Sequence, residues 1–157
     1  MMREDFFTFS EYIKKDQGLL TPSMEDYVEM IYRLSMHNGY TRINELSESL
    51  NVQPPSVTRM VQKLADINMV NYERYGKITL TESGILKGNM LLMRHNIIER
   101  FLRSIGVFRG ILEETEKIEH TISKETLECI VNYLSFLKEN PDIEKKFETY
   151  RESRVNE

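Results

Sequence analysis

Hydrophobic residues between positions 40 and 66 repeat with the spacing of two short helices. The apolar residues of the first helix stand at i, i+3 and i+7 and are Ile43, Leu46 and Leu50. The polar segment 51–53 interrupts this pattern, and the pair Pro54-Pro55 that follows is tolerated in the first turn of a helix. The apolar residues of the second helix also share one face and are Val57, Met60, Val61 and Leu64. The pattern predicts two short helices joined by a tight turn.

The residues that follow are expected to form a β-hairpin, with strands at Val70–Arg74 and Lys77–Leu80 and a turn at Tyr75-Gly76. A helix pair followed by a hairpin is the order of a winged helix-turn-helix domain, whose second helix enters the major groove of DNA. Polar side chains opposite the apolar face of that helix, together with two basic residues of the wing, are expected to face double-stranded DNA. They are Gln53, Pro55, Ser56, Thr58, Arg59, Gln62, Lys63, Arg74 and Lys77.

Helical patterns flank this segment. Thr21-Pro22-Ser23 opens a helix that runs to about residue 37, with Ser23 as its candidate N-cap. A long helix is expected from Thr81 to about Ser104. The remaining chain is expected to be helical at 111–121, at 124–138 with Ser123 as the cap, and in a last polar turn or helix at 142–151.

An apolar stripe on the helix 124–138 indicates an interface between subunits. Its members are Leu127, Ile130, Val131, Leu134 and Leu137. A small helical domain is not expected to bury this stripe by itself, so we expect a homodimer. The single cysteine, Cys129, lies among these residues and is expected to be a buried apolar thiol.

The sequence therefore predicts a mainly α fold with a small β-hairpin wing. A winged helix-turn-helix domain (21–88) is expected to precede a helical dimerisation domain (89–157). Residues 1–20 are expected to form an N-terminal extension, for which a short helix, an arm on a partner subunit and an unstructured segment are all open alternatives.

The charge balance opposes binding to a polyanion such as DNA. The formal net charge is −4, and residues 42–77, with five basic and four acidic side chains, carry only +1. Tight binding to DNA is therefore expected to need an additional cation. The lack of a membrane-length apolar run and of a signal-peptide pattern, together with a single cysteine, predicts a cytoplasmic protein without a membrane partner.

A candidate metal-binding motif lies at 116–120, E-K-I-E-H. Glu116, Glu119 and His120 stand at i, i+3 and i+4, so one helix points two carboxylates and an imidazole in the same direction. These donors suit manganese, iron(II) or zinc, and no thiolate is present to favour copper(I) or zinc. Taken alone, the motif is a weak signal for a metal site. Taken alone, Asp26 and Glu29 are compatible with a solvated acidic face of their helix. Taken alone, His95 is compatible with a structural histidine on the long helix.

Four motifs occur in the order T-P-S-M-E-D-Y-V-E (21–29), P-P-S-V-T-R-M-V-Q-K-L (54–64), R-H (94–95) and E-K-I-E-H (116–120). Together they resemble the diphtheria-toxin-repressor family of metal-dependent transcriptional regulators, and in particular its manganese-transport-regulator branch. The resemblance covers about Leu20 to Asn140.

The resemblance implies two neighbouring metal sites between the domains, with carboxylates that bridge a pair of ions. The ligands that it implies are Asp26, Glu29, His95, Glu116, Glu119 and His120. It further implies a repressor that binds the operator DNA of metal-uptake genes when two Mn(II) ions are bound per subunit. Iron-type members carry a Met and a Cys where this chain has Asp26 and Glu116, and these carboxylates favour Mn(II) over iron(II).

Two departures from the family pattern are visible. Thr121 stands where the manganese branch often has a second histidine, which is not expected to remove a ligand. The chain is also expected to lack the SH3-like third domain of the longer iron-type members.

Three other functions remain as alternatives. The first is an iron(II)-responsive repressor of the same family, and the second is a metal-independent winged-helix regulator with a small organic effector. The third is a dinuclear hydrolase built on the carboxylate and histidine cluster. The sequence offers no separate nucleophile, base or substrate loop beside that cluster, so we do not expect an enzyme.

Overall fold

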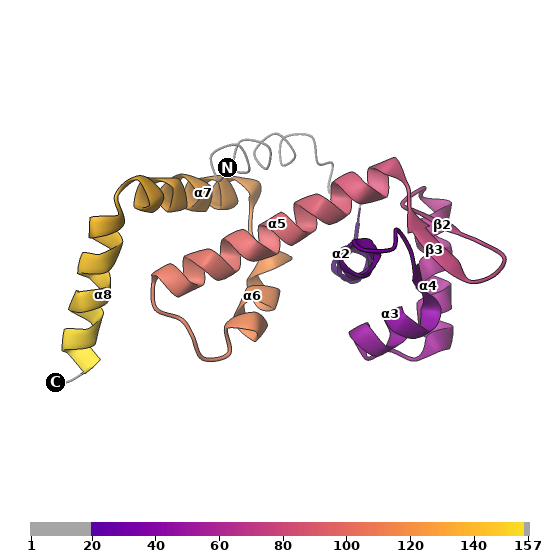
Figure 1. The fold of residues 1–157 in the computed structure, drawn as a ribbon, viewed down its shortest axis with the longest axis horizontal. Helices are drawn as coiled ribbons and strands as arrows, with labels where there is room; N and C mark the ends of the chain where they lie inside the picture. Colours follow the sequence, from indigo (N-terminus) through magenta and orange to yellow (C-terminus); the bar gives the residue numbers. More distant parts are fainter. Residues whose placement is uncertain (1–19, 156–157) are drawn as a thin grey trace. The chain divides into compact units, whose positions relative to one another are not determined.

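The computed structural model describes residues 20–155, so the predicted extension 1–20 lies outside the described residues except for Leu20. The chain forms two compact units. The described part of the first ends at Leu92, and the second continues from Met93 (Figure 1). The boundary falls within one long helix, α5 (Glu82–Ser104), so this helix contributes residues to both units.

The first unit is a winged helix-turn-helix domain. Its elements are α2 (Pro22–Ser35), β1 (Thr41–Arg42), α3 (Ile43–Leu50), α4 (Pro54–Asp66), β2 (Val70–Tyr72), β3 (Lys77–Leu80) and the first half of α5. The predicted helix pair and hairpin are confirmed. The hairpin belongs to a three-stranded antiparallel sheet of order β1-β3-β2, because β1 pairs with β3 as well. A two-residue strand is too short to leave an alternating pattern in the sequence.

The core of this unit consists of the faces that the hydrophobic spacing predicts. The fully buried residues include Leu46 of α3, Ile78 of β3 and, on one face of α4, Val57, Val61 and Leu64. Asn51 ends α3 in the left-handed conformation, with φ of 53°. The N–H of Val52 then donates to the carbonyl of Ser47 at 3.1 Å, which closes the tight turn into α4.

The start of α2 differs from the prediction. Thr21 is the N-cap, and its hydroxyl accepts from the N–H of Met24 at 3.2 Å. Ser23 is therefore not the cap. Pro22, which has no N–H, occupies the first turn and leaves the residue before it to provide the capping oxygen. On the buried face of α2, burial raises the pKa of Tyr27.

The second unit is helical. It contains the second half of α5, α6 (Ile111–Glu119), α7 (Lys124–Glu139) and α8 (Pro141–Val155). The predicted cap of α7 is confirmed, since the Ser123 hydroxyl accepts from the N–H of Thr126 at 3.1 Å. Among the described residues, no helix is long and apolar enough to cross a membrane.

Two expectations for α7 are wrong. The stripe from Leu127 to Leu137 is buried within a single chain, so it does not need a second subunit to cover it. Cys129 is exposed. Two residues along a helix rotate the side chain by about 200°, which turns Cys129 away from the face of Leu127. Apolar neighbours in the sequence therefore do not imply a buried thiol at this position.

Candidate metal centre and nucleic-acid interface

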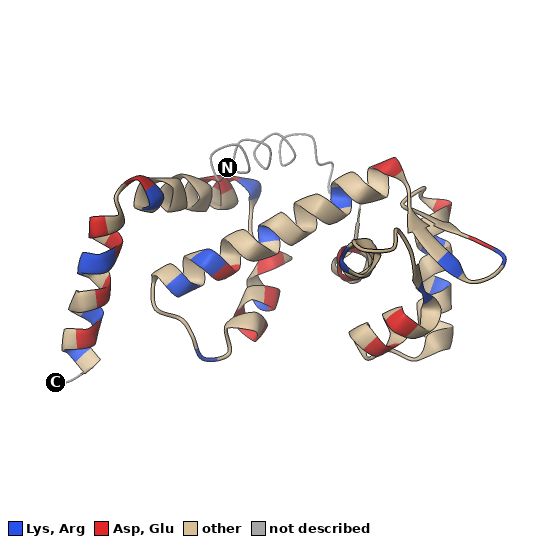
Figure 2. Cartoon of the chain, in the orientation of Figure 1, with Lys and Arg blue, Asp and Glu red and all other residues tan. Residues whose placement is uncertain are grey.

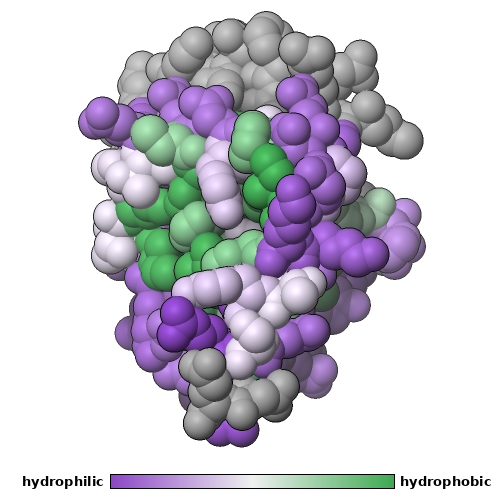
Figure 3. Space-filling view, turned by 90° about the vertical axis from the view of Figure 1, so that its left-hand side faces the viewer, coloured by the Kyte–Doolittle hydropathy of each residue, from purple (hydrophilic) through white to green (hydrophobic). Residues whose placement is uncertain are grey.

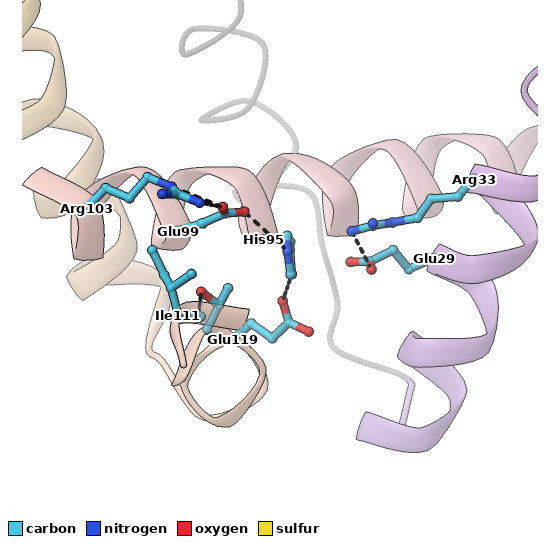
Figure 4. A network of polar contacts seen from close by, with 8 residues as sticks. Glu29, Arg33, His95, Glu99, Arg103, Ile111 and Glu119 are labelled. Carbon is cyan, nitrogen blue, oxygen red and sulfur yellow. Dashed lines mark hydrogen bonds and ion pairs between the residues drawn. The ribbon is translucent and has the colours of Figure 1, made fainter. Parts of the chain in front are cut away.

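A buried histidine and a buried carboxylate meet in the second unit. Nδ1 of His95 on α5 lies 2.8 Å from Oε2 of Glu119 at the end of α6, and both side chains are less than a tenth exposed. Figure 4 shows the imidazole ring pointing at this carboxylate. The contact joins residues from two helices and places two of the predicted metal ligands within hydrogen-bond distance of each other.

The third predicted ligand of this group is adjacent to the pair. His120 is the C-cap of α6, and its Nε2 lies 3.5 Å from Oε1 of Glu119. Its Nδ1 lies 3.3 Å from Nη2 of Arg94. A guanidinium can only donate, so this contact requires Nδ1 to accept and places the ring proton of a neutral His120 on Nε2, toward Glu119.

Glu99 is a residue of this cluster that the sequence reasoning missed. Its Oε2 lies 3.7 Å from Nε2 of His95, and its Oε1 accepts from Arg103 at 2.8 Å (Figure 4). The signal was present, because Glu99 follows His95 by four residues on one helix and therefore lies on the same face. Both ring nitrogens of His95 thus face a carboxylate.

The fourth predicted ligand of this unit has a different environment. Glu116 is exposed on α6, whereas Glu119 is buried on the same helix. Lys117 is engaged by two other carboxylates, at 2.9 Å from Glu113 and 3.1 Å from Glu114. The hydrogen bond with Lys117 lowers the pKa of Glu113, and the hydrogen bonds with these carboxylates raise the pKa of Lys117. The ammonium group is therefore held by carboxylates outside the predicted ligand set.

The two remaining predicted ligands lie on α2 of the first unit. Asp26 is exposed, and Glu29 is half-buried with its Oε2 at 3.1 Å from Nη2 of Arg33 (Figure 4). Glu25, which precedes Asp26, is buried and forms an ion pair with the buried Lys87 of α5 at 3.7 Å. This ion pair, which sequence reasoning did not identify, helps to fix α2 against the first half of α5.

The donor set of the second unit fits a divalent metal ion. Imidazole nitrogen and carboxylate oxygen are the ligands that manganese and iron(II) accept in proteins, and no sulfur donor lies among the predicted ligands. The residues present are therefore compatible with the metal centre that the sequence predicts.

The predicted DNA-facing residues all have accessible side chains in the first unit. On α4, Gln53 is the N-cap, and the exposed residues along the helix include Pro55, Arg59, Gln62 and Lys63. Ser56 and Thr58 are half-buried, and Nη2 of Arg59 donates to the Ser56 hydroxyl at 3.4 Å. In the wing, Arg74 is exposed and Lys77 is half-buried. Figure 2 shows basic positions on α4, on the strands and in the loop between β2 and β3.

Two protein-family models match the chain. Residues 19–78 match the N-terminal DNA-binding domain of the iron-dependent repressors, and residues 81–148 match the metal-binding and dimerisation domain of the same proteins. The matches together cover most of the chain and follow the order of the two units.

Known proteins with similar sequences carry names that concern transcription. The HTH-type transcriptional regulator MntR of Lysinibacillus sphaericus is 45% identical over 129 residues, which are 82% of this chain and 93% of that protein. The regulator of the same name from Geobacillus kaustophilus is 41% identical over 133 residues, which are 84% of this chain and 92% of that protein. Among solved structures, the manganese regulator SloR matches with a TM-score of 0.65 and 31% identity over 74% of this chain. This chain spans 55% of the length of SloR.

Proposed function

The chain belongs to the iron-dependent repressor family, and we propose that it is a manganese-responsive transcriptional repressor that acts in the cytoplasm. The observation that carries the metal response is the buried contact between His95 and Glu119, with His120 next to it. The winged helix-turn-helix unit of the same chain, whose wing is formed by the paired strands β2 and β3, would bind DNA.

We assign six metal ligands, and they come from both units. They are Asp26, Glu29, His95, Glu116, Glu119 and His120. Bound divalent ions, two per subunit, would supply positive charge and a defined coordination geometry to these side chains. Support comes from the type of donor and from the relatives that share the family, which include regulators named for manganese.

The side chains around the ligands favour a switch that is off without metal. Four carboxylates in one ligand set repel one another when no cation lies between them. Arg33 holds Glu29 at 3.1 Å and therefore competes with a metal ion for that carboxylate. Ordering of both units by shared ligands would reduce the conformational entropy that remains to be lost on DNA.

The net charge of the chain also favours tighter DNA binding when metal is bound. The formal net charge of −4 opposes association with DNA, and two divalent ions would raise it by four. Metal binding is therefore expected to improve DNA affinity even before any change in shape. The DNA contacts would be made by the exposed face of α4 and by Arg74 and Lys77 of the wing.

The proposed repressor is a homodimer that pairs through the second unit. Several large apolar side chains of this unit remain exposed: Ile105, Phe108, Leu112, Tyr133, Phe136, Ile143, Phe147, Tyr150 and Val155. Figure 3 shows an apolar area on the face of the molecule that it views, between hydrophilic flanks. An exposed apolar area with polar flanks is typical of an interface with another chain, and the second domain match is to a dimerisation domain.

Calorimetric titration of the protein with Mn(II), combined with DNA-binding measurements with and without Mn(II), tests the function. The DNA is a duplex that the wild-type protein recovers from a random-sequence pool in the presence of Mn(II). We expect stoichiometric metal binding and DNA binding that depends on it. DNA affinity that does not respond to Mn(II) would support a regulator with another effector, and a stronger response to iron(II) would support the iron-responsive alternative.

A further inference from the structure

We propose that Tyr75, at the tip of the wing, contacts DNA by donating its hydroxyl to a phosphate, and that Arg42 is the residue that positions it. This role rests on the DNA-binding function proposed above. Neither residue is among the nine positions that the sequence pattern predicts to face DNA.

The wing ends in a tight, internally bonded turn. The N–H of Glu73 donates to the carbonyl of Lys77 at 2.9 Å, and the N–H of Gly76 donates to the carbonyl of Glu73 at 3.0 Å. Gly76 has φ of +80°, a conformation that side chains disfavour, so glycine allows the chain to return to β3 here. Arg74 and Tyr75 are the two residues between these bonded ends, and the turn therefore points their side chains outward.

Tyr75 has the properties of a contact residue rather than of a packed one. Its side chain is 84% exposed, so it contributes little to the core of the unit. A tyrosine carries a hydroxyl that can donate to phosphate and a ring that can lie along the sugar-phosphate backbone. Its neighbours in the wing, Arg74 and Lys77, are cationic, and this charge favours the approach of phosphates to the same tip.

Arg42 connects the tip to the body of the domain. It lies on β1, opposite Lys77 of β3 in the sheet, and its Nη1 donates to the carbonyl oxygen of Tyr75 at 2.7 Å. This is a hydrogen bond from a charged group to the backbone of the tip residue itself, and such bonds are stronger than neutral ones. The bond fixes the carbonyl of Tyr75, and therefore restrains the backbone from which its Cα–Cβ bond leaves the turn.

An aromatic ring holds Arg42 in place. The ring of Tyr40 lies 5.6 Å from Cζ of Arg42 and 4.4 Å from Nζ of Lys77. Both distances are within the range of cation–π attraction, so one ring offsets the repulsion between two neighbouring cations. This contact restrains Arg42 in the position from which its Nη1 donates to the carbonyl oxygen of Tyr75.

The experiment is a double-mutant cycle in the full-length protein with Mn(II), on a duplex recovered from a random-sequence pool by the wild type. Tyr75→Phe removes only the hydroxyl, and Arg42→Met removes the donor and its charge. We expect Tyr75→Phe to weaken binding about tenfold, equally on recovered and scrambled duplexes, because a phosphate contact reads no sequence. In the Arg42→Met background, Tyr75→Phe should weaken binding by less than about twofold, because the hydroxyl is no longer positioned.

Arg154→Met in α8 is the matched control, since it removes one positive charge from an exposed arginine of the second unit. Wild-type affinity of Tyr75→Phe would overturn the contact, and losses that multiply fully in the double variant would overturn the positioning role. Unchanged Mn(II) stoichiometry in each variant separates these effects from misfolding. A wild-type protein that recovers no duplex would overturn the DNA-binding function and this role together, whereas wild-type binding with an inert Tyr75→Phe change overturns this role alone.

Discussion

Nδ1 of His95 and Oε2 of Glu119 lie 2.8 Å apart although the two residues are 24 positions apart in the sequence. A hydrogen bond at this distance needs one shared proton. A neutral imidazole can keep this proton on Nδ1 and offer only Nε2 to a metal ion, whereas ligation through Nδ1 itself would require the proton to leave. If both Nδ1 of His95 and Oε2 of Glu119 are ligands, as proposed, a bound ion would replace this proton between them.

His95→Gln tests this contact. Glutamine keeps a donor for Glu119, so the fold is expected to persist, but its amide is a poor ligand for Mn(II). Loss of a residue that only supports a metal ligand lowers metal affinity by about 10–100-fold. We expect the loss of His95, as a ligand itself, to lower Mn(II) affinity by at least this factor. Calorimetric titration measures the loss. His37→Gln, at an exposed histidine of the first unit, is the matched control and should bind Mn(II) like the wild type. Equal affinities for the two variants would remove His95 from the ligand set.

The contact between His95 and Glu119 also shows what spacing in the sequence cannot give. Helical periodicity predicts that Glu116, Glu119 and His120 point in the same direction, because that geometry depends only on the backbone. The distance from His95 depends on how α5 packs against α6, and no local pattern specifies that packing. The burial of Glu119 and the exposure of Glu116 follow from the same packing.

Elements with strong local signals were predictable. Two prolines and an unbroken apolar face define α4, and the observed helix begins at Pro54 as expected. The two-residue strand β1 was not predictable, because its pairing with β3 is a contact between distant segments. The predicted environment of Cys129 is wrong because the burial of a helical side chain depends on its angle around the helix and not on its neighbours in the sequence.

Gly84→Ala tests the packing of α5 in the first unit. An alanine in a helix is normally more stable than a glycine by up to about 1 kcal/mol. Here the added Cβ would lie 2.0 Å from the carbonyl oxygen of Met69, which is backbone and cannot rotate away. We expect the free energy of unfolding to fall by about 1–3 kcal/mol or more, as for other overpacked sites. Chemical denaturation measures it, with the exposed Ser83→Ala as control. A Gly84→Ala protein as stable as the wild type would show that α5 does not pack this closely against the backbone of Met69 in solution.

Arg59→Ala tests the exposed face of α4. If Arg59 contacts a base edge, its loss should weaken binding to the recovered duplex by about 1–3 kcal/mol and relax the preference at one position. Competition binding against duplexes that vary at each position measures both effects. An equal loss on every sequence would assign Arg59 to a phosphate instead, and an unchanged affinity would remove it from the interface.

A fragment of residues 20–92 tests the assignment of dimerisation to the second unit. The fragment keeps the ion pair between Glu25 and Lys87 and the close approach of Gly88 to Tyr32, so its own packing is preserved. It lacks α6, α7 and α8 and their exposed apolar side chains. We expect the full chain to sediment as a dimer and the fragment as a monomer. A fragment that dimerises as tightly as the full chain would place the interface in the first unit.

The double change Asp26→Met and Glu116→Cys tests the choice of metal. Carboxylate oxygens suit the hard Mn(II) ion, whereas thioether and thiolate sulfur favour iron(II), cobalt and nickel. Both residues are exposed in the present structure, so the replacements are not expected to disturb a core. We expect the variant to respond better to iron(II) and less well to Mn(II) than the wild type, as measured by DNA binding titrated anaerobically against each metal.

The matched control is the double change Glu113→Met and Glu114→Cys, which puts the same sulfur groups on exposed positions of α6 outside the ligand set. It should keep the metal ranking of the wild type, although it releases Lys117 from both of its carboxylates. Mn(II) binds weakly among divalent ions of its row, so affinity alone cannot select it. If Asp26 and Glu116 are ligands, we expect them to contribute to selectivity through the geometry that they impose. A metal ranking that is the same in both double variants would show that Asp26 and Glu116 are not ligands.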